Sequence, residues 1–304
     1  MVEGRIVPFL GAGANLCGRP PSQTWPDATT FLPNASELSA YLRSNWLGCD
    51  ETELTRVAQW VLEMGGSGEL FNALHDVFDR DYPPTRLHVF LAQLPALLAA
   101  RNYRPRHPLI VTTNYDDLLE RALNDAGQPF DLVTYMSDGE DRGKFFHTEP
   151  GGQPRRIEIP NSYFLPIDRR CVVLKIHGAV TRHHPDGEND SYVITEDHYI
   201  DYLTRTELTN LVPATLAAKL RKSHFLFLGY GLRDWNMRVI LHRIAGEQKL
   251  NYQSWAIQRS PTDLDQKFWD RRAVDILDID LDEYISRLRT SVEELPPASA
   301  AIRA

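Results

Sequence analysis

Short apolar runs alternate with helical patterns along most of this chain, and this alternation constrains the fold more than any other feature. The four most apolar runs are "RIVPFL" (5–10), "LIVTT" (109–113), "VVLKI" (172–176) and "HFLFLG" (224–229). They are continuously apolar, as strands buried on both faces are. Similar runs follow at 130–135, 253–258 and 273–279. The pattern predicts an α/β, Rossmann-like fold with a mainly parallel sheet and helices on both faces.

The length of 304 residues permits one large domain. We expect a single domain over residues 1–294 with a small helical subdomain. Within it we expect a helical insertion at 34–105, where Asn34 and Glu37 have the spacing of a capping box, and an irregular insertion at 136–170, which is rich in Gly, Pro and charge. Residues 295–304 are expected to form a flexible tail. This division leaves no room for a separate sensor domain.

Composition limits the compartment and the classes of partner. The net charge of -8 argues against nucleic-acid binding as the main activity. Cys17, Cys49 and Cys171 form no CxxC pair, which fits a reducing cytoplasm and cannot build a cysteine zinc ribbon. Gln93 and Pro95 interrupt the longest apolar stretch, which is too short for a bilayer. We expect a cytoplasmic protein that binds neither membrane nor metal.

Four of the predicted strands end in residues that could serve chemistry. These ends are Gly11-Ala12-Gly13, Asn114, His177-Gly178 and Gly229-Tyr230-Gly231. Because the carboxyl ends of parallel strands share one edge of a sheet, all four could converge on one crevice. Glycine turns can hold a pyrophosphate, a neutral histidine can deprotonate a hydroxyl or water, and an asparagine can donate and accept hydrogen bonds at once.

Each strand end also has a purely structural explanation. Gly11 and Gly13 could form only a tight turn, since the full dinucleotide fingerprint requires a glycine where Leu16 stands. Asn114 could cap the helix that follows it. His177 could be a satisfied histidine in a turn, and the late glycine turn could be a loop capped by Asp234.

The motifs "GAG", "TTNYD", "KIHG" and "FLGYGLRD", in this order, resemble the sirtuin-like family, specifically its branch in bacterial anti-phage defence proteins. The resemblance covers roughly residues 1–290. It implies that Asn114 and His177 are the catalytic pair and that Asp116 lines the nicotinamide end of the pocket. It also implies a dinucleotide site that includes Gly11, Ala12, Gly13, Asn15, Gly229, Gly231 and Asp234. Asn15 replaces the serine that is usual in the family's GAGxS motif.

The resemblance also implies a function. Members of this branch hydrolyse NAD+, as substrate, to ADP-ribose and nicotinamide and so deplete the infected cell. Standalone members occur with a hexameric HerA-type ATPase, which is therefore the implied partner. We expect a homo-oligomer whose activity is controlled by oligomerisation or by that partner. Two alternatives stay open: a catalytically silent module that binds NAD or ADP-ribose, and an NAD-dependent protein deacylase or ADP-ribosyltransferase. His183, His184 and Asp186 could suggest a metal, but a solvated loop explains them better.

Overall fold

The computed structural model describes residues 3–26, 30–46, 48–104, 107–182, 190–204, 211–231, 250 and 252–298. Its strands are β1 (Ile6–Leu10), β2 (Leu109–Thr112), β3 (Phe130–Tyr135), β4 (Phe145–Thr148), β5 (Arg155–Arg156), β6 (Cys171–Lys175), β7 (His224–Leu228), β8 (Ser254–Gln258) and β9 (Val274–Asp278). Its α-helices are α1 (Ala35–Asn45), α2 (Leu54–Phe78), α3 (Arg86–Ala99), α4 (Leu118–Asp125), α5 (Glu196–Thr204), α7 (Ala214–Arg221), α9 (Asp263–Asp270) and α10 (Leu281–Glu293). Two 3-10 helices, η1 (Ala12–Leu16) and η2 (Pro160–Ser162), complete the elements.

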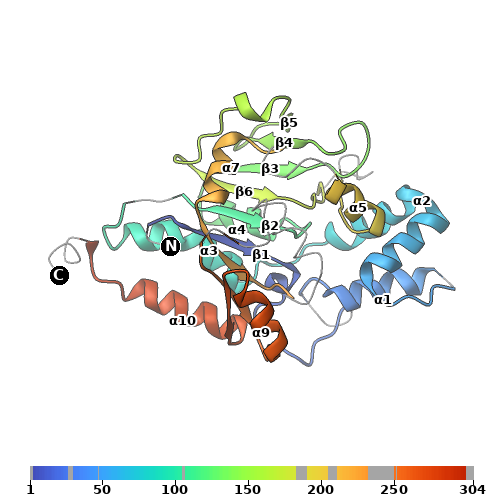
Figure 1. The fold of residues 1–304 in the computed structure, drawn as a ribbon, viewed down its shortest axis with the longest axis horizontal. Helices are drawn as coiled ribbons and strands as arrows, with labels where there is room; N and C mark the ends of the chain where they lie inside the picture. Colours follow the sequence, from blue (N-terminus) through green and yellow to red (C-terminus); the bar gives the residue numbers. More distant parts are fainter. Residues whose placement is uncertain are drawn as a thin grey trace.

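The strands form one sheet in the order β5-β4-β3-β6-β2-β1-β7-β8-β9 (Figure 1). In this order all pairs from β3 to β9 are parallel, and the β3–β4 and β4–β5 pairs are antiparallel. The predicted Rossmann-like α/β fold is therefore confirmed. Strands β2 to β6 all lie on one side of β1, and the later strands β7, β8 and β9 lie on the other side. The strand order therefore reverses between β1 and β7, and sheets of this kind bind ligands at such a topological switch point.

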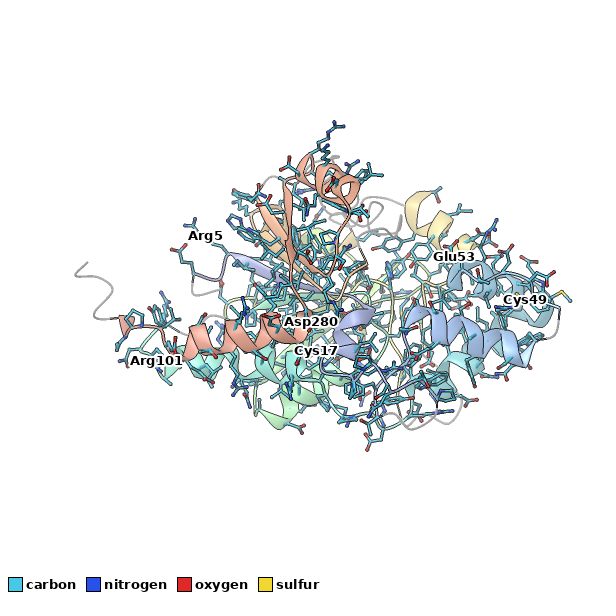
Figure 2. The ribbon with its side chains drawn as sticks, turned by 90° about the horizontal axis from the view of Figure 1, so that it is seen from below. Arg5, Cys17, Cys49, Glu53, Arg101 and Asp280 are labelled. Carbon is cyan, nitrogen blue, oxygen red and sulfur yellow. The ribbon has the colours of Figure 1, made fainter. Side chains whose placement is uncertain are left out.

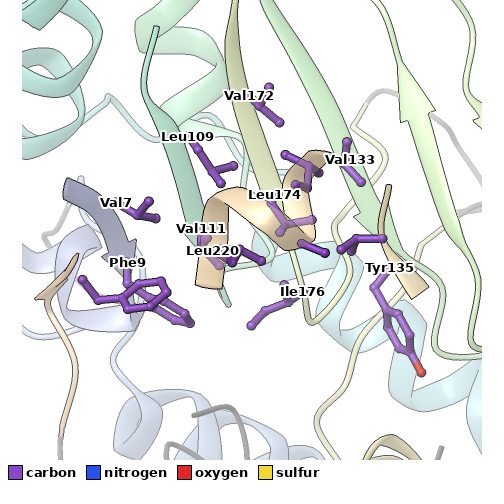
Figure 3. Close-up of a cluster of buried hydrophobic side chains, with 14 of the residues drawn as sticks. Val7, Phe9, Leu109, Val111, Val133, Tyr135, Val172, Leu174, Ile176 and Leu220 are labelled. Atoms are coloured by element: carbon purple, nitrogen blue, oxygen red, sulfur yellow. The ribbon is translucent and has the colours of Figure 1, made fainter. Parts of the chain in front are cut away.

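Helices cover both faces of the sheet because successive strand residues point in opposite directions. On one face Val7 and Phe9 of β1 join a core cluster with α5, α7 and α9; Figure 3 shows it with Leu220 of α7 packed over the strands. On the other face Leu10 joins a cluster with α3, α4 and α10. Burial on both faces explains why these strands are apolar at every position.

A helical lobe made of α1 and α2 lies beyond the strand ends and carries a third core cluster (Figure 1). Figure 2 shows Cys49 and Glu53 in this lobe, at the opposite end of the molecule from Arg101. Helix α2 is continuous except at Gly66, which has a non-helical backbone. Leu118 of α4 and Tyr192 belong to the same cluster, so the lobe is packed firmly onto the strand ends.

The segment at 136–170 contains β4, β5 and η2, and β4 extends the sheet as an antiparallel neighbour of β3. The three cysteines are free and buried. In the described part of the chain, no helix is both long and apolar enough to cross a membrane. The proposed domain limits stay a prediction.

The N-terminus of α1 is fixed by the predicted capping box. Asn34 Oδ1 accepts from the backbone N–H of Glu37 at 2.8 Å, and Glu37 Oε2 accepts from that of Asn34 at 2.9 Å. Glu37 also accepts hydrogen bonds from the Arg19 guanidinium and from the Trp25 backbone. Burial acts to raise the pKa of Glu37, but the bonds from Arg19, Asn34 and Trp25 outweigh it and lower the pKa to about 2.

This lowered pKa predicts acid sensitivity at α1. Because the pKa of Glu37 is about 2 in the folded protein, against an ordinary value of 4.5, its stabilisation is full above pH 4.5 and is lost as pH falls toward 2. With solvent screening allowed for, this pKa difference corresponds to on the order of 1 to 2 kcal/mol. We expect Glu37→Gln to lower the free energy of unfolding at neutral pH, and the gap to wild type to shrink below pH 4.5. Urea unfolding across this pH range measures the difference in free energy of unfolding between the variant and wild type. Glu69→Gln, at an exposed position, is the control and should unfold like wild type.

Candidate active site

Pairing between β2 and β6 places two predicted site residues side by side. Thr112 of β2 is in register with Lys175 of β6, and Asn114 and His177 each lie two residues farther along. Neighbouring strands are about 4.8 Å apart, so these two residues leave the sheet together. Gly11 follows β1 and Gly229 follows β7 directly. Since β6, β2, β1 and β7 are adjacent, the four predicted strand ends do lie along one edge.

A cavity of about 510 Å³ opens at this edge, a size typical of sites for small ligands. Its lining comes from the strand ends and from the helical lobe. The lining residues are Ala12, Gly13, Asn15, Pro33, Asn34, Ala35, Leu38, Leu54, Phe78, Thr113, Asn114, Tyr115, Asp116, His177, Tyr199, Gly229, Tyr230 and Gly231. Among these described residues Asp116 is the single acidic side chain, and no lysine or arginine is present.

Eight of the predicted site residues line this cavity: Ala12, Gly13, Asn15, Asn114, Asp116, His177, Gly229 and Gly231. Gly11 is at the end of β1 but is not part of the cavity wall. Asp234 lies outside the described residues, as do His183, His184 and Asp186 of the metal alternative. In the described portion, no group of three or more His, Cys, Asp or Glu side chains could hold a metal ion.

The two glycine turns pack against each other backbone to backbone. Gly11 N donates to Leu228 O at 3.0 Å, and Gly13 N donates to Gly229 O at 2.8 Å. Gly229 has a φ of +70°, and a Cβ there would overlap the backbone N of Ala14. Close approach of the turns thus accounts for these glycines. It also engages two of the N–H groups that a phosphate cradle would use.

Asn114 does not cap the following helix. The helix α4 begins at Leu118, whose N–H donates to Asp116 Oδ1 at 3.1 Å, so Asp116 provides the side-chain acceptor at this helix start. The backbone N–H of Asn114 donates to Thr112 Oγ1 at 3.0 Å, and its Nδ2 donates to Asn15 Oδ1 at 3.2 Å. The structural alternative for Asn114 is therefore wrong, and its amide is directed to the site.

His177 is held by aromatic rings and by a glycine. Tyr199 and Tyr202 of α5 contact the imidazole nearly perpendicularly, each with ring centroids 5.5 Å away. The His177 side chain is 3% exposed and reaches the cavity wall. The chain then turns at Gly178, whose φ of +90° and contact with the Ser191 backbone leave no space for a Cβ. The "HG" pair thus directs the imidazole toward the cavity.

A buried cation lies under the site. Lys175 is 1% exposed; its Nζ donates to the backbone O of Asp116 and to Glu120 Oε1, the latter at 2.8 Å. Burial raises the pKa of Glu120, and the Lys175 ammonium opposes this shift. Nearby, burial lowers the pKa of His88 to about 4, while Asp116 acts to raise it and Lys175 to lower it, so His88 is neutral at pH 7.

Several lining residues had no signal in the sequence. Asn34 and Leu38 reach the cavity only because α1 folds over the strand ends, and Phe78 only because α2 does. Tyr230, within the predicted late turn, connects that turn to the end of β2, since its OH donates to Thr113 Oγ1 at 2.9 Å. Lys175 did have a signal: it is a lysine inside an otherwise apolar strand.

The family model for the SIR2-like domain matches residues 108–277, more than half of the chain. The chain belongs to the SIR2-like family. The matched segment runs from β2 to β9 and includes Asn114, Asp116 and His177.

This SIR2-like chain is similar to curated proteins with longer sequences. It is 25% identical over 93% of its length to "Defense-associated sirtuin 2" of Bacillus subtilis, covering 24% of that protein. It is 31% identical over 64% of its length to "NAD(+) hydrolase ThsA" of Acinetobacter baumannii, covering 32% of it. The corresponding ThsA of Cytobacillus dafuensis is 27% identical over 64% of the chain and is covered to 31%. The chain thus spans about a quarter to a third of these relatives.

The packing of the glycine turns predicts that Gly229→Ala destabilises the SIR2-like domain. The added Cβ would overlap backbone atoms of the β1 turn, so the two turns must separate, and we expect a loss of at least about 2 kcal/mol. Denaturant unfolding measures this loss. Gly68→Ala, at an exposed helical position where nothing lies within 4 Å, should be neutral or stabilising. Equal effects of the two variants would contradict this account of the turns.

The buried ammonium yields a second prediction. Lys175→Met leaves the Glu120 carboxyl and the Asp116 carbonyl without their donor, so we expect the free energy of unfolding to fall by about 3–5 kcal/mol. The double variant Lys175→Met with Glu120→Leu removes both charges and should recover part of this loss. Thermal and denaturant unfolding compare the two. If the loss of unfolding free energy in the double variant equals the sum of the losses in the two single variants, Lys175 and Glu120 are not coupled.

Proposed function

We propose that this chain hydrolyses NAD+ to ADP-ribose and nicotinamide and that it acts in bacterial anti-phage defence by depleting NAD+. One observation carries the proposal: Asn114 and His177 leave two neighbouring strands in register and line the same cavity as Asp116. The names of relatives support it, since three matched proteins are NAD(+) hydrolases and one is a defence-associated sirtuin.

The reaction requires that the ribose and the attacking water are positioned, and it requires one proton acceptor. The bond between the ribose C1′ and the pyridinium nitrogen breaks, and nicotinamide leaves as a neutral base with the bonding electron pair. Water forms the new C1′–O bond and loses one proton. Positive charge builds on the ribose as the leaving group departs, so a carboxylate near the ribose favours the transition state. Asp116 supplies the acidic group in the described wall.

Each predicted residue then has a role. Asp116 holds the nicotinamide end, and Asn114 positions the ribose or the attacking water. His177 contacts a ribose hydroxyl and accepts the proton from the nucleophile. The pyrophosphate passes the Gly11–Gly13 turn, where Ala12 and Gly13 leave the cavity wall without a large side chain. The adenosine lies near Gly229 and Gly231, which line the cavity.

Control by assembly is part of the proposal. NAD+ loss is lethal to the cell that carries it out, so unregulated hydrolysis has to be prevented. We place the protein in the cytoplasm as a homo-oligomer that works with a HerA-type hexameric ATPase, on the basis of its resemblance to standalone defence proteins. The assays below are therefore run on the chain alone and with such an ATPase.

The proposal predicts that Asn114→Ala and His177→Ala each lower the rate of NAD+ cleavage on the order of a hundredfold or more, because each removes a group that acts in the transition state. Chromatography of free nicotinamide gives the rate. Asn45→Ala, at an exposed position of α1, and His107→Ala, in the segment before β2, are matched controls and should keep wild-type activity.

The same assay separates the alternatives. If both site variants cleave NAD+ like wild type, the catalytic assignment is wrong. If wild type releases no nicotinamide, alone or with the ATPase, yet binds ADP-ribose, the chain is a silent binding module. If nicotinamide appears only when an acylated or acceptor protein is added, the chain is a deacylase or an ADP-ribosyltransferase.

A further inference from the structure

Two hydrogen bonds join three polar side chains at the cavity wall. Asn114 Nδ2 donates to Asn15 Oδ1 at 3.2 Å, and Asn15 Nδ2 donates to Asp116 Oδ2 at 2.6 Å. The three side chains come from η1 and from the segment after β2, and all are buried: Asn114 is 8% exposed, Asn15 4% and Asp116 5%. Asn15 therefore connects the acidic residue to the asparagine.

The direction of this chain of bonds is set by Asp116. Its Oδ1 accepts from the backbone N–H of Leu118, and its Oδ2 accepts from Asn15. A carboxylate can only accept, so the amide of Asn15 has to turn its Nδ2 toward Asp116. The Lys175 ammonium, which donates to the backbone O of Asp116, keeps this segment in place. Asn15 consequently presents its Oδ1 to Asn114.

The orientation of Asn114 follows from that of Asn15. Facing an acceptor oxygen, Asn114 has to donate with its Nδ2, and its own Oδ1 then lies on the other side of the amide. Within the described residues, no donor reaches Asn114 Oδ1. The reversed amide would bring two acceptor oxygens together. Of the two orientations open to an asparagine, one is therefore selected before any ligand binds.

We propose that Asn15 is a positioning residue that, with Asp116, fixes the amide of Asn114 so that Oδ1 accepts a hydrogen bond from the substrate complex. This inference rests on the proposed function and specifies it. The group that faces Asn114 Oδ1 has to be a donor, which selects the attacking water or a ribose hydroxyl and excludes the ring oxygen and the phosphates. Asn15 acts through Asn114 and does not itself contact the reacting atoms.

Kinetics of two Asn15 variants test this role in the full-length protein, assayed with NAD+ under the conditions in which wild type is active. Asn15→Leu keeps the branched shape and the number of side-chain heavy atoms but removes both hydrogen bonds, so we expect kcat to fall by about tenfold or more with KM within about threefold. Asn15→Ser can accept from Asn114 and donate to Asp116 with one hydroxyl, and should retain more activity than Asn15→Leu. Asn45→Leu, at an exposed asparagine, should match wild type.

Two kinetic outcomes would overturn the proposal. If Asn15→Leu has the kcat of wild type, the orientation of the Asn114 amide does not depend on Asn15. A change in KM alone, with an equal loss of ADP-ribose affinity, would make Asn15 a contact to the ligand. Melting temperatures of all variants identify any that fail to fold, and Asn15→Ser then replaces Asn15→Leu as the deciding variant.

A measurement that needs no activity separates this inference from the proposed function. In protein labelled with ¹⁵N at asparagine, the Nδ2 hydrogens of Asn114 should exchange with solvent far more slowly than those of exposed Asn45, and Asn15→Leu should remove this protection. If wild type protects Asn114 but cleaves no NAD+, the proposed function fails and the positioning chain stands. If Asn114 exchanges as fast as Asn45 in wild type, the positioning chain does not exist.

Discussion

Backbone hydrogen bonding among the four central parallel strands fixes the geometry on which the rest of the site depends. The residues that follow β6, β2, β1 and β7 are far apart in sequence, from Gly11 after β1 to Gly229 after β7. Register alone brings them to one edge: Thr112 pairs with Lys175, and Leu10 pairs with both Thr112 and Leu228. A slip of one residue in any of these pairs would turn the following side chain to the other face of the sheet. Burial on both faces prevents such a slip.

A polar layer lies directly beneath this edge, where an apolar core would pack more easily. Lys175 is the centre of this layer, since its ammonium connects the segment after β2 to α4 through Asp116 and Glu120. A buried ion pair contributes little net stability compared with apolar side chains of the same size. Its effect here is geometric, because any movement of the Asp116 carbonyl would remove a hydrogen bond from a buried ammonium.

The helical lobe forms the part of the cavity wall that the strand ends do not provide. Clusters of apolar side chains join α1 and α2 to Leu118, Val180 and Tyr192, which all follow strands of the central sheet. The N-terminus of α1 is fixed by the capping box at Asn34 and Glu37, and it contributes residues to the cavity. The stability of α1 and the shape of the cavity are thus linked.

The sequence by itself determined seven of the nine described strands, each to within one residue at each end, because continuous apolar runs are stable only when both faces are buried. The antiparallel β4 and β5 were not predicted, since they lie in the segment 136–170 that was expected to be irregular. It also determined that glycine, asparagine and histidine follow those strands. Only the tertiary structure decided what these residues contact. Gly11, Gly13 and Gly229 are explained by the close approach of a turn far away in the chain, and Asn114 by Asn15, not by the helix it precedes. Hydrogen-bond partners and cavity walls depend on long-range packing, which local periodicity does not encode.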